Sequence, residues 1–194
     1  MSLTAITGGI GSGKSTVSQL LRTMGFDVYD CDARAKHLMT ADADLRRDLV
    51  EAFGPATYDA DGALCRKHLS SIVFANAQRL AELNALVHPA VMRDLEAWHA
   101  AHLAAAPGRR LFYESAILFE SGFDRLATGG IWCVSAPMEL RARRTAARDH
   151  ASAEAVAARI AAQMPQEERE RRSTHIIYND ASHSVIEQVN GLLM

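Results

Sequence analysis

The sequence predicts an α/β fold in which helices cover both faces of a parallel sheet. Short apolar runs alternate with stretches whose apolar residues recur at helical spacing. A glycine-rich segment joins the first apolar run to the first helical stretch. Strands that alternate with helices along a chain form parallel sheets, because each connection has to cross over the sheet.

Five apolar runs are the expected strands, and Pro, Gly and capping residues bound the expected helices. The strands are expected at residues 3–7, 26–30, 111–113, 131–134 and 176–178. The helices are expected at 15–24, from 31 to about 53, across 63–106, at 138–149, at 152–163 and after a capping box at 184–187. Within the long helical segment, Pro89 is expected to open a new helix, and Pro107-Gly108 to end the segment.

Length and composition exclude several classes of protein. The 194 residues predict one domain, with a helical subdomain at 55–108 inserted between the second and third strands. A formal net charge of -2 argues against a nucleic-acid binder, which needs an excess of cations. No apolar run reaches the roughly 18 residues that a membrane span requires, and the N-terminus does not read as a signal peptide. Three scattered cysteines predict reduced thiols and a cytoplasmic location.

Residues 8–15, GGIGSGKS, match the phosphate-binding pattern G-x-x-x-x-G-K-[ST] between an expected strand and an expected helix. Glycines let the backbone amides converge on phosphate oxygens, and the helix N-terminus adds positive potential. Lys14 is expected to reach the β- and γ-phosphates, and the Ser15 hydroxyl to bind Mg²⁺. A glycine-rich turn without a ligand is the alternative. The expected ATP-binding residues are Gly9, Ile10, Gly11, Ser12, Gly13, Lys14, Ser15 and Thr16.

The remaining motifs favour a small-molecule kinase over a GTPase switch or a motor ATPase. No N-K-x-D segment is present, and the third strand does not end in Asp-Glu. Asp30 and Asp32 follow the second strand, whose carboxyl end shares an edge of the sheet with the phosphate loop. A carboxylate there can accept the proton of an attacking hydroxyl, which is the role expected for Asp32. Either carboxylate could instead cap the following helix.

Arginines of the two helices at 138–165 are the expected lid. Arg144 and Arg148 are four residues apart, so they share a helix face, and Arg141 and Arg143 lie in the same stretch. Arginines that close over the γ-phosphate stabilise the charge of the transition state and exclude water. The alternative is a solvated helix face with acidic partners at 139 and 149. A solvated face is also the expectation for Arg169, Arg171 and Arg172, which alternate with glutamates.

Taken together, these motifs resemble the dephospho-CoA kinase family over nearly the whole chain. The matching segments are residues 7–16, 28–32, 53–54, 61–66, 69, 73–74, 88–89, 117–122, 159–163 and 177–179. The resemblance implies ATP-dependent phosphorylation of the ribose 3′-hydroxyl of dephospho-CoA, with Mg²⁺, as the last step of coenzyme A biosynthesis. It also implies a three-layer α/β/α P-loop kinase fold with a five-stranded parallel sheet, a helical acceptor-binding insertion at 55–108 and a helical lid at 138–165.

The resemblance also implies roles for individual residues. The expected catalytic residues are Asp32, Lys14, Arg144 and Arg148, and the expected acceptor-binding residues are Asp32, Arg66, His88, Leu118 and Glu120. His88 could instead be a packed residue before Pro89, and Glu120 a loop carboxylate. Glu114 could order a water bound to Mg²⁺.

Two other functions stay open at this point. One is another small-molecule or nucleoside monophosphate kinase on the same scaffold, and the other is a nucleotide-binding module without catalysis. The expected partners are ATP and dephospho-CoA, with no nucleic acid or membrane, in a monomer or a weak homo-oligomer.

Overall fold

A computed structural model describes residues 2–73 and 76–194 of the chain. It divides into two compact units, one formed by Met1–Asp30 with His102–Met194 and the other by Cys31–Ala101. The second unit therefore includes residues 31–54, which the sequence does not assign to the predicted insertion. Phe74, part of the family resemblance, lies outside the described residues.

The first unit contains a five-stranded parallel sheet in the order β2-β3-β1-β4-β5. All five expected strands are confirmed. They are β1 (Leu3–Thr7), β2 (Val28–Asp30), β3 (Leu111–Glu114), β4 (Ile131–Ser135) and β5 (His175–Tyr178). Because β1 is central, the loop that follows it lies between the ends of β3 and β4.

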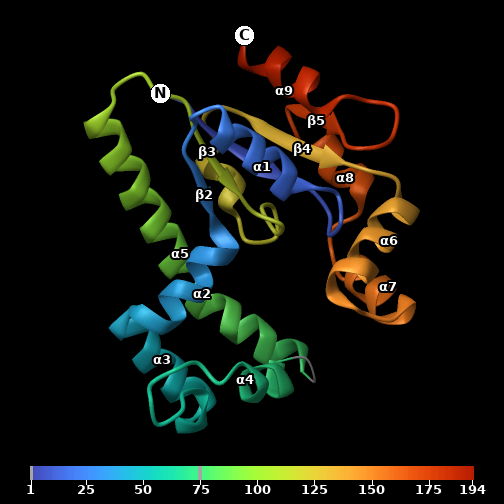
Figure 1. Cartoon of the computed structure of the whole chain (residues 1–194). Coiled ribbons are helices and arrows are strands. Elements are labelled where there is room, and N and C mark those ends of the chain that lie inside the picture. Colours follow the sequence, from blue (N-terminus) through green and yellow to red (C-terminus); the bar gives the residue numbers. More distant parts are fainter. Residues whose placement is uncertain (1, 74–75) are drawn as a thin grey trace. The chain divides into compact units, whose positions relative to one another are not determined.

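Side chains of β4 alternate between the two faces of the sheet. Trp132 and Val134 join the apolar cluster under α1 (Lys14–Thr23) and α9 (Val185–Leu193). Cys133 and Ser135 face α8 (Gln166–Arg171) on the other side, where they meet the side chains of Gln166 and Glu170. Figure 1 shows α1 and α9 on one face of the sheet and α8 on the other, so the predicted α/β/α layering is confirmed.

Two further helices of this unit are α6 (Met138–Asp149) and α7 (Ala153–Ala161), which pack against each other. They match the helices expected in the predicted lid. The short 3₁₀ turn η2 (Phe123–Leu126) packs near β1. Ser184 caps α9 as expected, since its hydroxyl accepts the amide hydrogen of Glu187.

The second unit is helical. It contains α2 (Cys31–Ala41), α3 (Ala43–Phe53), the 3₁₀ turn η1 (Pro55–Thr57), α4 (Arg66–Val73) and α5 (Ala77–Ala105), whose last turn belongs to the first unit. Its buried apolar residues include Leu45, Leu49, Phe53, Leu69, Val73, Val91 and Leu95. Arg34 of α2 makes a two-point ion pair with Asp94 of α5, with nitrogen–oxygen distances of 2.8 and 2.7 Å.

One expected boundary is wrong. Pro89 opens no helix but lies inside the continuous helix α5. A proline removes one helical hydrogen bond and strains the turn before it. Val87, Ala90 and Val91 around it are buried, so packing of this turn outweighs that local cost.

The apolar cluster under α1 predicts a large effect of truncating a helix side chain. Leu21 is fully buried there. We expect Leu21→Ala to lower the free energy of unfolding by about 2–5 kcal/mol, because it leaves a cavity that the sheet cannot fill. Urea unfolding measures the effect. The control is Gln19→Ala on the exposed side of the same helix, expected within about 0.5 kcal/mol of the parent. An equal effect of both substitutions would contradict this packing.

Candidate active site

The segment between β1 and α1 forms a compact loop. Gly11 and Gly13 have φ angles of 76° and 97°, in the left-handed region that favours glycine. The Ser12 amide donates to the Gly9 carbonyl at 3.1 Å, which closes a turn, and α1 begins immediately afterwards at Lys14. The predicted strand–loop–helix arrangement is therefore present.

The loop keeps backbone donors available for an anion. Among the described residues, the amides of Gly11, Gly13 and Ser15 have no backbone or side-chain acceptor. They lie at or just before the N-terminus of α1, where the helix dipole favours negative charge. The Lys14 ammonium group donates to the Gly8 carbonyl at 3.0 Å, so it folds over the start of the loop. These groups form a cradle suited to phosphate.

Other segments pack closely against the outer wall of the loop. A Cβ atom at Gly9 would collide with the guanidinium group of Arg141, and one at Gly11 with the Arg141 carbonyl. A Cβ atom at Gly13 would collide with the Asn179 side-chain amide. At Gly11 the backbone angle and the nearby Arg141 carbonyl both require glycine, and at Gly13 the backbone angle does. At Gly9 the obstructing atoms belong to the end of the Arg141 side chain.

Polar contacts from distant segments hold the same wall. The side-chain amide of Asn179, just after β5, donates to the Ser12 carbonyl at 2.8 Å. Arg144 of α6 donates to the Asn179 carbonyl at 3.1 Å. The Ile10 amide donates to the Gln163 side-chain oxygen at 2.8 Å, and its carbonyl accepts from Arg141 at 3.1 Å. Sequence reasoning linked Gln163 and Asn179 to the family but gave neither a role.

Carboxylates gather at the edge of the sheet where the loop begins. Glu114 ends β3, and Asp30, its register partner, ends β2. The Ser18 hydroxyl of α1 donates to Glu114 Oε2 at 2.6 Å. Ser15 and Ser18 are three residues apart, so they share a face of α1. The exposed Ser15 hydroxyl therefore lies about one helical turn from the position where Ser18 binds the Glu114 carboxylate. Hydroxyl and carboxylate oxygens are donors that suit Mg²⁺.

Asp32 lies two residues after Asp30. Helix α2 begins at Cys31, so Asp32 occupies the first helical turn rather than the position before it, and its side chain is exposed. A carboxylate in a first turn is stabilised by the helix dipole. The ion pair between Arg34 and Asp94 ties the same turn of α2 to α5.

The arginines of α6 have different surroundings. Arg141 is buried against the loop, and burial together with the nearby Arg169 charge lowers its pKa. Arg144 reaches the segment after β5, as described above. Arg148 is exposed and binds the neighbouring Asp149 at 2.7 Å, which raises the Arg148 pKa. Of these three side chains, Arg141 is the one in direct contact with the phosphate loop.

The predicted acceptor residues lie in both units. Arg66 is exposed at the start of α4, and His88 is half-buried on α5. Glu120 accepts the Met164 amide at 3.1 Å. Leu118 is fully buried, so its side chain presents no surface to an acceptor and belongs to the core.

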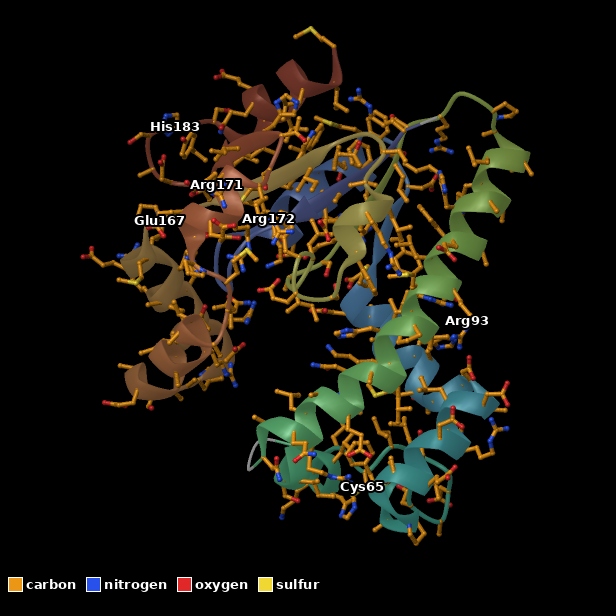
Figure 2. The ribbon with its side chains drawn as sticks, turned by 180° about the vertical axis from the view of Figure 1, so that it is seen from behind. Cys65, Arg93, Glu167, Arg171, Arg172 and His183 are labelled. Carbon is orange, nitrogen blue, oxygen red and sulfur yellow. The ribbon has the colours of Figure 1, made fainter. Side chains whose placement is uncertain are left out.

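Arg169 corrects another expectation, since it is fully buried rather than on a solvated face. Its nearest carboxylate oxygen belongs to Glu120, at 3.5 Å, and none of its three side-chain nitrogens has a hydrogen bond among the described residues. The reason is that α8 lies flat on the sheet, which turns one side of this charged helix inward. For Arg171 the expectation is confirmed, because this side chain is exposed and paired with Glu168. Figure 2 shows Glu167 and Arg171 on this helix and Arg172 directly after it.

Buried Cys133 lies beneath α8. Burial raises the pKa of its thiol to about 11, so the group is neutral at physiological pH and acts as a small apolar side chain. Across residues 2–73 and 76–194, no three His, Cys, Asp or Glu side chains cluster as a metal site, and no helix is long and apolar enough to cross a membrane.

Nearly the whole chain is similar to known proteins. The sequence profile described as "Dephospho-CoA kinase" matches residues 2–184. A dephospho-CoA kinase of Salinibacter ruber is 42% identical over 183 residues, which cover 94% of this chain and 90% of that protein. The dephospho-CoA kinase of Chlorobaculum tepidum is 41% identical over 200 residues, covering 99% and 95%.

Solved structures are similar as well. The crystal structure of a Thermus thermophilus protein matches with a TM-score of 0.82 and 38% identity, over 99% of this chain and 95% of that one. The dephospho-CoA kinase of Campylobacter jejuni matches with a TM-score of 0.71 and 24% identity, over 98% and 94%. The second likeness supports the fold alone.

His88 predicts a pH dependence of stability. Burial lowers its pKa in the folded state below the ordinary value of about 6.5, so the unfolded chain binds the proton more readily. The folded state is therefore favoured at neutral pH, and this contribution is lost as the pH falls below about 6.5. We expect the midpoint of thermal unfolding to fall less between pH 7.5 and 5.5 in His88→Asn than in the parent. His37→Asn, on the exposed side of α2, is the control and should follow the parent.

Proposed function

The chain belongs to the dephospho-CoA kinase family, and from this premise we propose that it transfers the γ-phosphoryl group of ATP to the ribose 3′-hydroxyl of dephospho-CoA. The products are coenzyme A and ADP. The observation that carries the proposal is the loop at residues 8–16, whose unpaired amides and Lys14 make an anion cradle at the start of α1. Membership of the family is the reason for proposing dephospho-CoA as the acceptor, and the anion cradle is the reason for proposing that ATP binds at this loop.

The cradle accounts for binding of the donor phosphates. Amides at Gly11, Gly13 and Ser15 are fixed in position before the nucleotide arrives, so little reorganisation is needed when charge develops on the transferred group. Lys14 moves from the loop carbonyls to the β- and γ-phosphates, exchanging neutral acceptors for charged ones. Arg144 and Arg148 add positive charge when the predicted lid at 138–165 closes.

Asp32 is proposed to accept the proton of the 3′-hydroxyl. As the hydroxyl oxygen attacks the γ-phosphorus, its proton passes to the Asp32 carboxylate, and the bond from the γ-phosphorus to the bridging oxygen breaks to release ADP. The support is that this carboxylate is exposed in the first turn of α2, directly after the strand that ends beside Glu114.

Mg²⁺ fits the oxygen donors at the start of α1. We propose that the Ser15 hydroxyl holds the ion together with the nucleotide phosphates, with Glu114 contributing through an ordered water. Bound there, the ion would neutralise charge on the phosphates. Arg66, His88 and Glu120 remain proposed acceptor contacts within the predicted insertion and the loop after β3. A cytoplasmic location and a monomeric or weakly oligomeric state remain predictions.

The acceptor is tested directly by measuring ADP release. Dephospho-CoA, adenosine, AMP, CMP and shikimate are offered in turn with ATP and Mg²⁺. We expect turnover with dephospho-CoA to be at least about a hundredfold faster than with the other four acceptors. An acceptor that lacks the matching groups leaves polar groups of the site without hydrogen-bond partners, which lowers its rate of reaction. Preference for another acceptor would overturn the proposed function. ATP binding without any transfer would indicate a nucleotide-binding module.

The role of Asp32 has its own test. We expect Asp32→Asn to lower kcat by roughly 10²–10⁴, the contribution typical of a general base, while the affinity for ATP is kept. Asp44→Asn is the matched control, because Asp44 is an exposed carboxylate of α3 paired with Arg47. Near-normal turnover of the Asp32 variant would remove this residue from the proton transfer.

A further inference from the structure

Helix α6 is flanked by open space on two sides. One cavity, of about 560 Å³, lies between α6 and α7 and is lined mainly by alanines with Val156 and Ile160. A second, of about 590 Å³, lies between α6, the end of β4 and α8. Apolar packing against the rest of the unit is interrupted on these two sides, so the polar contacts at the two ends of the helix pair gain importance.

Both ends of the helix pair meet at one residue of the phosphate loop. Arg141, near the start of α6, donates through Nε to the Ile10 carbonyl at 3.1 Å. Gln163, just after α7, accepts the Ile10 amide hydrogen through its side-chain oxygen at 2.8 Å. The peptide groups on either side of Ile10 are thus bound from both ends of the predicted lid.

The segment that carries Gln163 is itself held in place. The next residue, Met164, donates its amide to Glu120 Oε1 at 3.1 Å. Gln166 accepts from Arg141 at 3.3 Å and donates to Glu170 at 2.8 Å, and Glu170 also accepts from Ser135 of β4 at 2.6 Å. Gln163 therefore extends from an anchored backbone, so the position of its side-chain oxygen is well defined.

The chemistry of glutamine suits this contact. Its oxygen accepts a hydrogen bond without carrying charge. A glutamate would accept the same hydrogen bond but would bring a negative charge close to the phosphates. An apolar side chain of the same length would leave the Ile10 amide without its partner, and this amide could then turn toward the anion and change the shape of the loop.

We propose that Gln163 is a positioning residue for phosphoryl transfer. It holds the Ile10 amide outside the set of phosphate donors and fixes the loop so that the amides of Gly11, Gly13 and Ser15 meet the anion. It also couples the C-terminal end of the predicted lid to the loop, because the lid cannot shift there without disturbing Ile10. This role deepens the proposed function and rests on it, since positioning has its effect at the transferred phosphoryl group.

The test compares Gln163→Met, which removes the acceptor, with Gln163→Glu, which keeps it and adds charge. We expect Gln163→Met to lower kcat/KM for ATP about tenfold, because the Ile10 amide loses its hydrogen bond to Gln163 and the phosphate loop shifts slightly. Amide exchange of Ile10, followed by NMR, should become about tenfold faster. Gln163→Glu should keep the parent exchange rate of Ile10 while raising KM for ATP, more strongly at low ionic strength.

Gln19→Met is the matched control, the same substitution at an exposed glutamine of α1, and should match the parent in every measurement. Unchanged Ile10 exchange in Gln163→Met, or losses of activity that merely follow thermal stability in both variants, would overturn the positioning role. Ile10 exchange needs no acceptor. If the parent failed to phosphorylate dephospho-CoA, the proposed function would fail, while Ile10 exchange would still decide whether Gln163 holds the loop.

Discussion

The phosphate loop has to satisfy two opposite demands, and the surrounding structure follows from them. Its inner amides must stay unpaired to bind an anion, while its outer wall must be fixed well enough to keep them in place. Packing from α6 and from the segment after β5 meets the second demand. Arg141 and Asn179 approach the loop so closely that a Cβ atom at Gly9, Gly11 or Gly13 would meet one of them, and at Gly11 the atom it would meet is the Arg141 backbone carbonyl. Glycine in this loop therefore serves both the backbone angles of the cradle and the close packing of its outer wall.

The parallel sheet brings several groups of the site together, because its strands all end at the same edge. Its strand ends share one edge, so β1 delivers the loop, β2 delivers Asp30 and β3 delivers Glu114 to the same side of the sheet. The first two turns of α1 add Ser15 and Ser18, and the Ser18 hydroxyl donates to Glu114. The hydrogen bonds between the strand backbones thereby set the positions of Asp30 and Glu114.

Buried charge outside the site shows a different constraint. Arg169 lies on the buried side of α8 with Glu120 as its nearest carboxylate. Burial, together with the nearby Arg169 charge, lowers the pKa of Arg141. A buried guanidinium group carries a large desolvation cost, so such an arrangement persists only where the surrounding fold holds it firmly. The same carboxylate also binds the backbone just after Gln163. Glu120, in the loop after β3, therefore both lies beside the buried Arg169 charge and binds the end of the predicted lid.

The sequence by itself determined the five strands, the strand–loop–helix motif and the residue types of the anion cradle, because each depends on spacing within one short segment. It also carried the resemblance to the family, because the matching segments follow one another in order along the chain. Only the tertiary structure decided that Arg141 faces the loop, that Arg169 and Leu118 are buried, that Pro89 lies within one helix and that Gln163 reaches Ile10. Residues 10 and 163, like residues 120 and 169, meet through the packing of helices on a sheet. The spacing of residues within one segment does not predict such contacts, because they depend on which face of each helix packs against the sheet.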